Sequence, residues 1–398
     1  MGYIPTPIAN CVTKVSKWNP RQEADAKAFP YVDLSSVNKE TKSISLEDVP
    51  IVAPAEAPSR ARQLIAAGDV LVSTVRPNLN GVALVCDQFD GATASTGYCV
   101  LRPNPNKLDS KYLFYWVQMP NFVELMMKQA TGASYPAVSD RVVKGSEIPL
   151  PPLTEQQRIA VILDKADALR RKRQRAIDLA DQFLRSVFLE MFGDPVTNPK
   201  EWEERTLSDI ALVRSGVTKG RKLEGKKTVS VPYMRVANVQ DGHIKLDDVQ
   251  EIEVLETDVE RYALNPGDLL LTEGGDPDKL GRGAVWHGEV MPCIHQNHIF
   301  CVRADAETVH PEFLSAQIGS QRGKRYFLKV GKQTTGIATI NKTVLSAYPA
   351  IVPPMDQQLK YVALVEKVRS SLSRVSASDT EIKSLFHSMS QQAFSGKL

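Results

Sequence analysis

The sequence has few cysteines, and their spacing argues against two common frameworks. Its five cysteines are odd in number, widely spaced and never form a Cys-x-x-Cys pair, so neither a disulfide framework nor a zinc ribbon is indicated. No run approaches the roughly 18 consecutive apolar residues of a membrane-spanning helix. The first residues also lack the basic and apolar regions of a signal peptide. The sequence therefore predicts a cytoplasmic protein with reduced cysteines.

The sequence also lacks a strong excess of either charge. A net charge of +3 over 398 residues says little about partners, because nucleic-acid binding shows as local basic patches. The composition, 42% hydrophobic and 24% charged, is that of a globular protein with ample material for cores. At about 150 residues per domain, the length predicts two or three domains.

Proline and glycine are absent from one long stretch, 154–192, which lies between Pro151-Pro152 and Gly193. This stretch predicts a single helix of roughly 58 Å. Thr154 can cap its first turn, and Gln157, three residues on, can complete a capping box with it. Its apolar residues recur alternately three and four apart, as in a heptad seam that needs a partner helix. The seam consists of Ile159, Ile162, Ala166, Leu169, Ala176, Ala180, Phe183, Val187 and Met191. The basic run RRKRQR at its middle argues against burial inside one large domain.

The two halves of the chain repeat the same order of features at an offset of about 200 residues. The first half combines short β-like runs, turn signals and a helix predicted over 110–119 or on to 127. The matched segments are 68–74 with 267–273, 98–102 with 299–303, 111–113 with 312–314, 131–134 with 335–338, and 148–153 with 349–355. Each half is therefore expected to form a similar globular head followed by a long helix.

The second half ends in a predicted long helix, about 356–394, which supplies the missing partner. If the chain folds this helix back along the first, the pair forms an antiparallel coiled coil. Arg173 or Arg170 then falls near Asp379 at mid-length, and we predict that they pair and fix the register.

Three short segments coincide with the duplicated order. They are LPPLTEQQRI at 150–159, which opens the first helix, MFGDP at 191–195, which closes it, and AFSGKL at 393–398. Together they resemble the repeated conserved regions of the specificity (S) subunits of type I DNA restriction-modification systems, and the resemblance covers the whole chain. The second helix departs from the first, since MDQQ at 355–358 stands where the first copy has LTEQQ at 153–157.

The repeat and the resemblance together imply an α+β fold. Two similar globular α/β target-recognition domains, 1–152 and 195–353, would be separated by two long helices, 153–194 and 354–398, forming an antiparallel coiled coil. Each domain is expected to read one half of a bipartite, asymmetric DNA site, while the helices set the spacer.

The resemblance also implies the partners. They are double-stranded DNA, two methyltransferase (M) subunits and the restriction (R) subunits, with no membrane. S-adenosylmethionine, ATP and Mg²⁺ are expected on those subunits, and no cofactor on this chain.

A catalytic site is not apparent, so the chain is predicted to be non-catalytic. It has neither an Asn/Asp-Pro-Pro-Tyr/Phe amino-methyltransferase motif nor a glycine-rich S-adenosylmethionine loop. The segment 220–227 nearly fits a phosphate-binding loop, but Lys227 stands where Ser or Thr must bind Mg²⁺.

Two groups of residues could hold a metal, although a structural role is favoured for both. Cys293, His295 and His298 have no remote fourth ligand in view. The second group, Glu273, Asp276 and Asp278, is interrupted by Gly and Pro and is more simply read as a loop. No metal site is predicted.

Local basic clusters in the second head favour contacts with DNA phosphates, with a merely solvated loop as the alternative for each residue. The first cluster is Lys219, Arg221, Lys222, Lys226 and Lys227, and the second is Arg322, Lys324, Arg325, Lys329 and Lys332. The RRKRQR block of the first helix either contacts spacer phosphates or only solvates the helix.

Base reading needs side chains with paired donors and acceptors at loop tips. The candidates are Arg76, Asn78, Asn80, Ser134 and Tyr135 in the first head, and Lys279, Arg282, Gln333 and Thr334 in the second. Each could equally form a tight turn, since Asn and Gly are what such turns require.

The leading hypothesis is a DNA sequence-specificity subunit that recruits methyltransferase and restriction subunits. The alternative is a bivalent scaffold that binds protein partners through two similar heads on a coiled-coil rod and does not read DNA.

Overall fold

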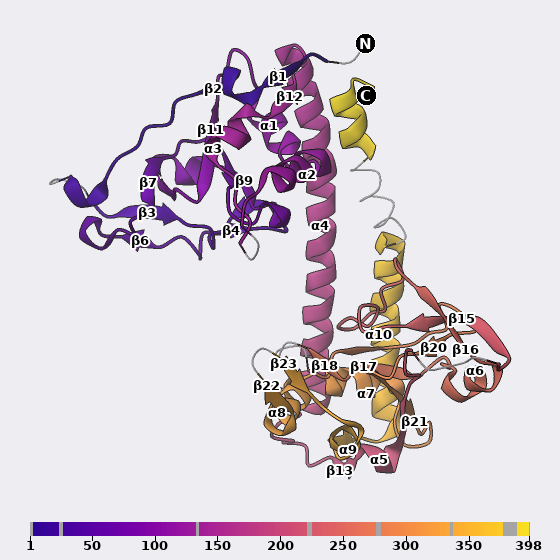
Figure 1. Ribbon diagram of the computed structural model, residues 1–398. Coiled ribbons are helices and arrows are strands. Elements are labelled where there is room, and N and C mark those ends of the chain that lie inside the picture. Colours follow the sequence, from indigo (N-terminus) through magenta and orange to yellow (C-terminus); the bar gives the residue numbers. More distant parts are fainter. Residues whose placement is uncertain are drawn as a thin grey trace. The chain divides into compact units, whose positions relative to one another are not determined.

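The computed structural model of the chain describes residues 3–23, 27–132, 135–220, 225–275, 280–334, 337–376 and 388–397. It consists of two compact units, Met1–Arg175 together with Val375–Leu398, and Ala176–Arg374. One helix, α4 (Leu153–Phe192), contributes residues to both units (Figure 1). The long helix predicted over 154–192 is thus confirmed, as expected for a stretch without helix-breaking proline or glycine.

The first unit is built from short strands and short helices. Its strands are β1 (Pro5–Pro7), β2 (Val12–Thr13), β3 (Phe29–Val32), β4 (Val37–Asn38), β5 (Ser43–Ile44), β6 (Ile51–Val52), β7 (Ala61–Leu64), β8 (Val70–Ser73), β9 (Val82–Leu84), β10 (Thr93–Ser95), β11 (Tyr98–Pro103) and β12 (Glu147–Pro149). Its helices before α4 are α1 (Ser110–Trp116), α2 (Pro120–Gln129) and α3 (Asp140–Gly145). The two larger sheets have the orders β6-β3-β10-β7 and β2-β11-β8-β9.

The second unit repeats this plan. Its strands are β13 (Glu203–Thr206), β14 (Ala211–Ser215), β15 (Thr228–Met234), β16 (Gln250–Leu255), β17 (Leu269–Thr272), β18 (Gly274–Gly275), β19 (Gly283–Val285), β20 (Ile294–His295), β21 (Ile299–Ala304), β22 (Lys332–Thr334), β23 (Ile337–Thr339) and β24 (Pro349–Val352). Its helices are α5 (Leu207–Ile210), α6 (Glu256–Tyr262), α7 (Pro311–Ile318), α8 (Gln321–Val330), α9 (Lys342–Ser346) and α10 (Met355–Ser376).

The internal repeat holds at the level of strand pairing. The sheet β14-β21-β17-β19 corresponds to β2-β11-β8-β9, and the pair β13-β24 corresponds to β1-β12. The parallel pair of β15 with β20 likewise corresponds to that of β3 with β10. The fold class predicted from the repeat, two similar domains of mixed helix and strand, is confirmed.

One buried ion pair recurs at the same place in both units. Asp69 accepts two hydrogen bonds of 2.8 and 2.7 Å from the Arg102 guanidinium, and Asp268 accepts two of 2.7 Å from Arg303. Each carboxylate comes immediately before a central strand, β8 or β17, and is almost fully buried. The matched sequence motifs therefore form the same ion pair, the Asp–Arg tie, between neighbouring strands in each unit.

A buried glutamine joins each head to its long helix. The amide of Gln156 donates to Lys107 O and Pro151 O, and its oxygen accepts from Asp109 N at the start of α1. Gln358 makes the equivalent three bonds, to Thr308 O, Pro353 O and His310 N. The repeated PP-x-x-x-Q pattern thus fixes the direction in which each helix leaves its head.

Two predicted helix boundaries are wrong. The helix expected over 110–119 or to 127 is two helices, because Pro120 starts α2 and the preceding Met119 is extended (φ −64°, ψ 139°), as residues before proline tend to be. Thr154 is not the cap of α4, because the helix already begins at Leu153. The Pro152 carbonyl accepts from Glu155 N and Gln156 N in the first turn instead.

The buried apolar residues of α4 lie toward its two ends. Ile159 and Leu163 are completely buried in the first unit, and Phe188 and Phe192 are buried in the second. In the middle of the predicted seam, Leu169 and Phe183 are 54% and 50% exposed. The residues predicted to face that middle part, around Asp379, lie outside the described residues.

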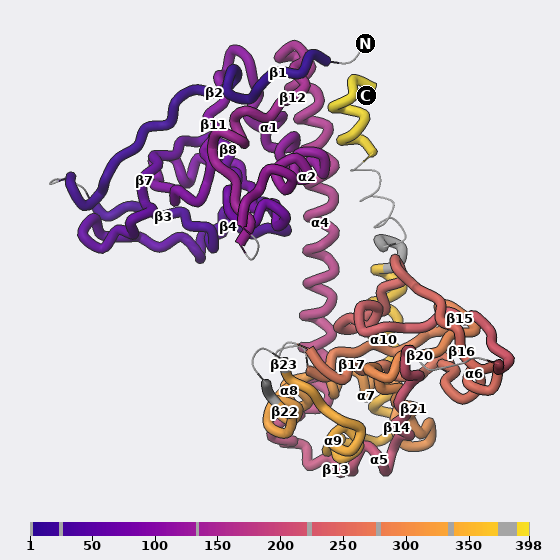
Figure 2. The backbone as a smooth tube through the Cα atoms, in the orientation of Figure 1, coloured from indigo at the N-terminus to yellow at the C-terminus, as the bar shows by residue number. Residues whose placement is uncertain are grey.

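Helix α10 contacts the end of α4 in the second unit, and the C-terminal segment 388–395 contacts its start in the first unit. In the second unit, Phe192 near the end of α4 lies 5.8 Å, between ring centroids, from Tyr361 near the start of α10. Figure 2 shows the C-terminal segment 388–395 beside the first part of α4, and its Phe394 shares a core with Ile159. Among the described residues, no helix is long and apolar enough to cross a bilayer.

Candidate nucleic-acid interface

In the first unit, the two loops predicted to read bases lie side by side. Val75 and Ala137 form a β-bridge, and Arg76 N donates to Pro136 O at 2.7 Å. The Arg76 guanidinium lies 4.5 Å from the centre of the Tyr135 ring, which is 68% exposed. The structure therefore brings Arg76 and Tyr135 together as an exposed cation–π pair.

The tip of the first loop is a tight turn. Arg76 and Asn80 have φ of 49° and 46°, in the left-handed region, on either side of the 3-10 turn Pro77–Leu79. Asn80 Nδ2 donates to Gln118 O at 3.2 Å, whereas Asn78 is exposed. Asn80 thus serves the turn, and Asn78 projects from it. A left-handed arginine is costly for the backbone, so its presence at a loop tip fits a functional role.

The second unit places its two loops together through a small sheet. β23 pairs with β18, which follows β17, and also with β22, giving the order β18-β23-β22. The backbone of Gln333 and Thr334 lies in β22, opposite Ala338 and Ile337. Arg282 precedes β19, and its Nη1 donates to Gln240 Oε1 at 3.2 Å.

Several predicted contact residues cannot be placed. Ser134, Arg221, Lys222, Lys279 and Asp379 lie outside the described residues. The side chains of Gln333 and Thr334 are likewise not described. Of the register residues that are described, Arg170 bonds Asp167 on its own helix at 2.8 Å, and Arg173 is buried.

The first basic cluster is at the surface. Lys219, Lys226 and Lys227 are exposed, and Lys219 follows β14 at the edge where β17 also ends. Lys227 pairs with Glu256 at 2.8 Å, an exposed contact worth less than about 1 kcal/mol. Such a pair opens readily, so Lys227 remains able to meet a phosphate.

The second basic cluster contains one residue that was interpreted wrongly. Arg322 is only 8% exposed, and its guanidinium donates to Pro349 O and Pro195 O and pairs with Glu204 at 2.8 Å. It holds the fold together and does not contact phosphates, because its donors are already engaged inside the unit. The remaining members, Lys324, Arg325, Lys329 and Lys332, are half-buried or exposed.

Sequence reasoning missed that Lys42 of the first head lies near Arg170 of α4. Lys42, at the turn between β4 and β5, donates to Asn80 O at 2.5 Å. Burial, together with the nearby charge of Arg170, lowers the pKa of Lys42 to about 8. Part of the RRKRQR block therefore lies beside the loop that carries Asn80, and only the fold brings these segments together.

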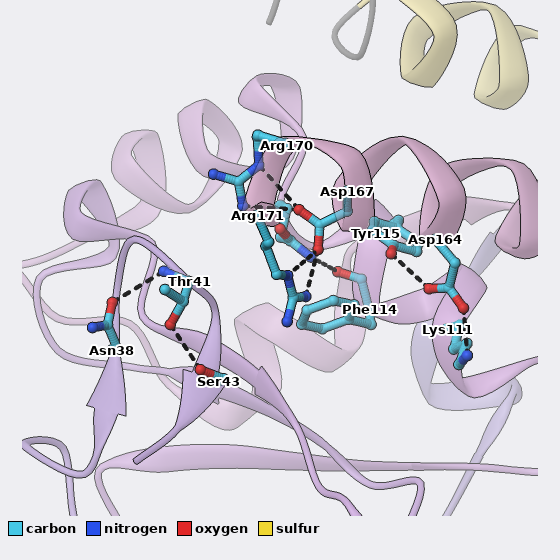
Figure 3. Close-up of polar contacts among 11 residues, drawn as sticks. Asn38, Thr41, Ser43, Lys111, Phe114, Tyr115, Asp164, Asp167, Arg170 and Arg171 are labelled. Atoms are coloured by element: carbon cyan, nitrogen blue, oxygen red, sulfur yellow. Dashed lines mark hydrogen bonds and ion pairs between the residues drawn. The ribbon is translucent and has the colours of Figure 1, made fainter. Parts of the chain in front are cut away.

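Figure 3 shows this region of α4. Asp167 pairs with Arg170 and Arg171 next to the β4–β5 turn, while Asp164 accepts from Tyr115 at 2.7 Å and pairs with Lys111. Asp167 orients two arginines of the basic block without neutralising both. The block thus keeps positive charge at this surface.

Of the metal candidates, Asp276 and Asp278 lie outside the described residues, and the described ones have different surroundings. His295 is buried and bonded to Ile299 O at 3.0 Å, whereas His298 is exposed and bonded to Glu273 at 2.6 Å. Cys293 bonds Ile294 O, and burial raises the pKa of its thiol to about 12. In the part of the chain that the structure describes, no three His, Cys, Asp or Glu side chains converge as a metal site would require.

His295 predicts a pH dependence of stability. Burial lowers its pKa from 6.5 to about 4. Within that window the unfolded chain binds a proton that the folded chain does not, so the second unit loses stability as the pH falls, by roughly 3 kcal/mol in total. Hydrogen exchange of second-unit peptides at pH values above and below the window measures the loss.

The variant His295→Asn, which keeps a donor for Ile299 O, is the control for this prediction. It should show a smaller decrease in stability over the same window than the unchanged chain. Equal pH profiles for the two proteins would contradict the assignment to His295.

Curated proteins with known roles share sequence with this chain. Residues 13–179 and 199–382 each match the type I restriction modification DNA specificity domain. The EcoKI specificity subunit of Escherichia coli K12 is 22% identical over 321 residues, 75% of this chain and 68% of that protein. The MjaIX specificity subunit of Methanocaldococcus jannaschii is 22% identical over 341 residues, 77% and 76%. The match to the putative MjaX specificity subunit of the same organism, at 24% identity, spans only 37% of that protein.

Solved structures share the fold. The S subunit of a type I restriction-modification system from M. genitalium covers 98% of this chain and 96% of its own, with a TM-score of 0.55 and 14% identity. A chain from a study of assembly and conformational transition of the type I system covers 100% and 98%, with a TM-score of 0.53 and 22% identity. Because the two matched domains span most of the sequence, the chain belongs to the family of type I restriction-modification DNA specificity proteins.

Proposed function

We propose that this chain is the non-catalytic subunit that reads a bipartite, asymmetric DNA site, one half per unit. The observation that carries the proposal is the duplication itself. Both units share the Asp–Arg tie and the Gln junction, yet they differ in the loops that follow β8 and β17. Shared frames with different loops are what two half-sites of different sequence require.

DNA affinity would come from phosphates and sequence choice from the loops. Exposed lysines such as Lys219 and Lys226, and the region of Lys42 and Arg170, supply positive charge that releases counterions. Arg76 and Asn78 in the first unit, and the loops around Arg282 and β22 in the second, present groups able to read base edges.

The chemistry would reside on partner subunits. We expect two methyltransferase subunits carrying S-adenosylmethionine, with restriction subunits carrying ATP and Mg²⁺. Exposed apolar residues along α4, among them Val161, Leu179 and Leu189, offer a surface for such partners.

Footprinting of the full chain in complex with its methyltransferase tests the proposal. Two short protected tracts separated by an unprotected spacer are expected, with affinity that falls steeply as salt is raised. Binding without sequence preference at every salt concentration would instead favour a scaffold for protein partners.

The continuous helix α4 makes the spacer a further test. Deleting seven residues, 174–180, from the exposed middle of α4 shortens it by about 10 Å. We expect the spacer length in the methylated motif to change while both half-sites are retained, as read from the methylation pattern of host DNA. Altered half-site bases, or a spacer of unchanged length, would contradict the proposal that α4 sets the spacer.

A further inference from the structure

Two backbone hydrogen bonds show which residues are equivalent at the base of the reading loops. Thr74 N donates to Gly97 O at 2.9 Å in the first unit, and Glu273 N donates to His298 O at 3.0 Å in the second. The carbonyls of Thr74 and Glu273 then accept from Val138 and Ile340, both at 2.9 Å. Glu273 and His298 therefore occupy the places that Thr74 and Gly97 hold in the other unit.

The side chains at these equivalent places differ in kind. Thr74 is buried, and its hydroxyl donates a hydrogen bond to Gly97 O at 2.9 Å. At Gly97 a Cβ atom would lie 3.0 Å from Leu34, so the first unit has little room for a side chain there. Glu273 and His298 have side chains that are 31% and 57% exposed. The second unit thus presents two partly exposed polar side chains at places where the first unit has a buried threonine and a glycine.

The Glu273 carboxylate is held in a fixed position. His298 Nδ1 lies 2.6 Å from Glu273 Oε2 and donates to it, because an ionised carboxylate can only accept. The next residue, Gly274, packs so closely on Thr339 that a Cβ would come within 2.8 Å of its Cγ2. Among the described residues, no hydrogen bond reaches Oε1, which leaves this atom for a ligand.

A carboxylate at a surface proposed to bind DNA requires an explanation. It repels DNA phosphates, and so it lowers affinity for every sequence alike. The base-edge group that a carboxylate recognises well is an exocyclic amino group in the major groove, above all N4 of cytosine. A carboxylate can therefore add sequence choice where it costs general affinity.

We propose that Glu273 reads an exocyclic amino group, that of cytosine before adenine, in the half-site of the second unit. His298 is the positioning residue that aims the carboxylate. This inference rests on the proposed function and deepens it, by assigning one base contact to one unit. Both residues were candidates for a metal, and their contact with one another gives them a different role.

The test is competition binding by the full chain in complex with its methyltransferase. The competitors are duplexes in which each base pair of the footprinted site is replaced in turn. For Glu273→Gln, discrimination at one base pair of one half-site should fall about tenfold, with every other position unchanged. His298→Ala should weaken the same position, and His298→Asn, which keeps a donor, should restore part of it.

Glu307→Gln is the matched control. It removes an exposed carboxylate from the loop that follows the other end of β21, and its discrimination profile should equal that of the unchanged chain. A purely structural role for the pair predicts a uniform loss at all positions, and this result would overturn the inference. So would an unchanged profile for Glu273→Gln. If the unchanged chain itself shows no separated half-sites, the proposed function fails first.

Discussion

We expect the Phe394→Ala replacement to lower the free energy of unfolding of the first unit by about 3–5 kcal/mol, as full truncation of a buried phenylalanine does. Phe394 is 6% exposed and lies in the core of that unit. Its ring centroid is 5.0 Å from that of Tyr112 and 5.1 Å from that of Trp116. The cavity would open between α1 and the C-terminal segment, so hydrogen exchange in α1 should accelerate.

Phe183→Ala is the matched control, because it makes the same chemical change at a phenylalanine that is half exposed on α4. Its cost should stay below about 1 kcal/mol. Equal losses for the two variants would mean that the C-terminal segment does not complete the first core. Hydrogen exchange of peptides from the second unit should be unchanged in Phe394→Ala.

The Asp268→Ala replacement should cost the second unit about 3 kcal/mol, near the lower end expected for breaking a buried pair. The lower end applies because the Arg303 side chain is partly exposed and recovers some hydration. The loss includes the hydrogen bond that Asp268 accepts from Asn265 N at 2.8 Å. Asp69→Ala should have the same effect on the first unit, with each loss confined to its own unit.

A double variant tests whether Arg303 is the partner whose loss destabilises the second unit. Because the half-buried Arg303 left without its partner adds to the penalty, Asp268→Leu combined with Arg303→Met should be more stable than Asp268→Leu alone. Peptide-resolved hydrogen exchange measures each unit separately. If the double variant is no more stable than the single one, Arg303 is not the partner that matters.

The repeat made much of the fold predictable. The matched segments 68–74 and 267–273 became β8 and β17 with their flanking aspartates, and 98–102 and 299–303 became β11 and β21. What the alignment of the halves could not reveal is that Asp69 bonds Arg102. Pairing of side chains across strands depends on register, which two aligned motifs do not specify.

The candidate site was predictable in outline and not in its contacts. The loops of Arg76 and Tyr135 were identified separately, and their β-bridge appears only once β8 and α3 are placed. Arg322 looked like a phosphate ligand because its neighbours are basic, whereas its partner Pro195 O is remote in sequence. The closeness of Lys42 to Arg170 was missed for the same reason, since long-range contacts leave no local pattern.

The backbone bonds at Thr74 and Glu273 also bear on how such a protein changes over generations. Each loop is tied to the sheet by main-chain atoms, so the tie survives whatever side chain stands there. Substitutions that alter the preferred DNA sequence can then accumulate at little cost in folding free energy. New preferences become accessible by single replacements, while the Asp–Arg ties at the opposite ends of β8 and β17 help to keep each unit folded.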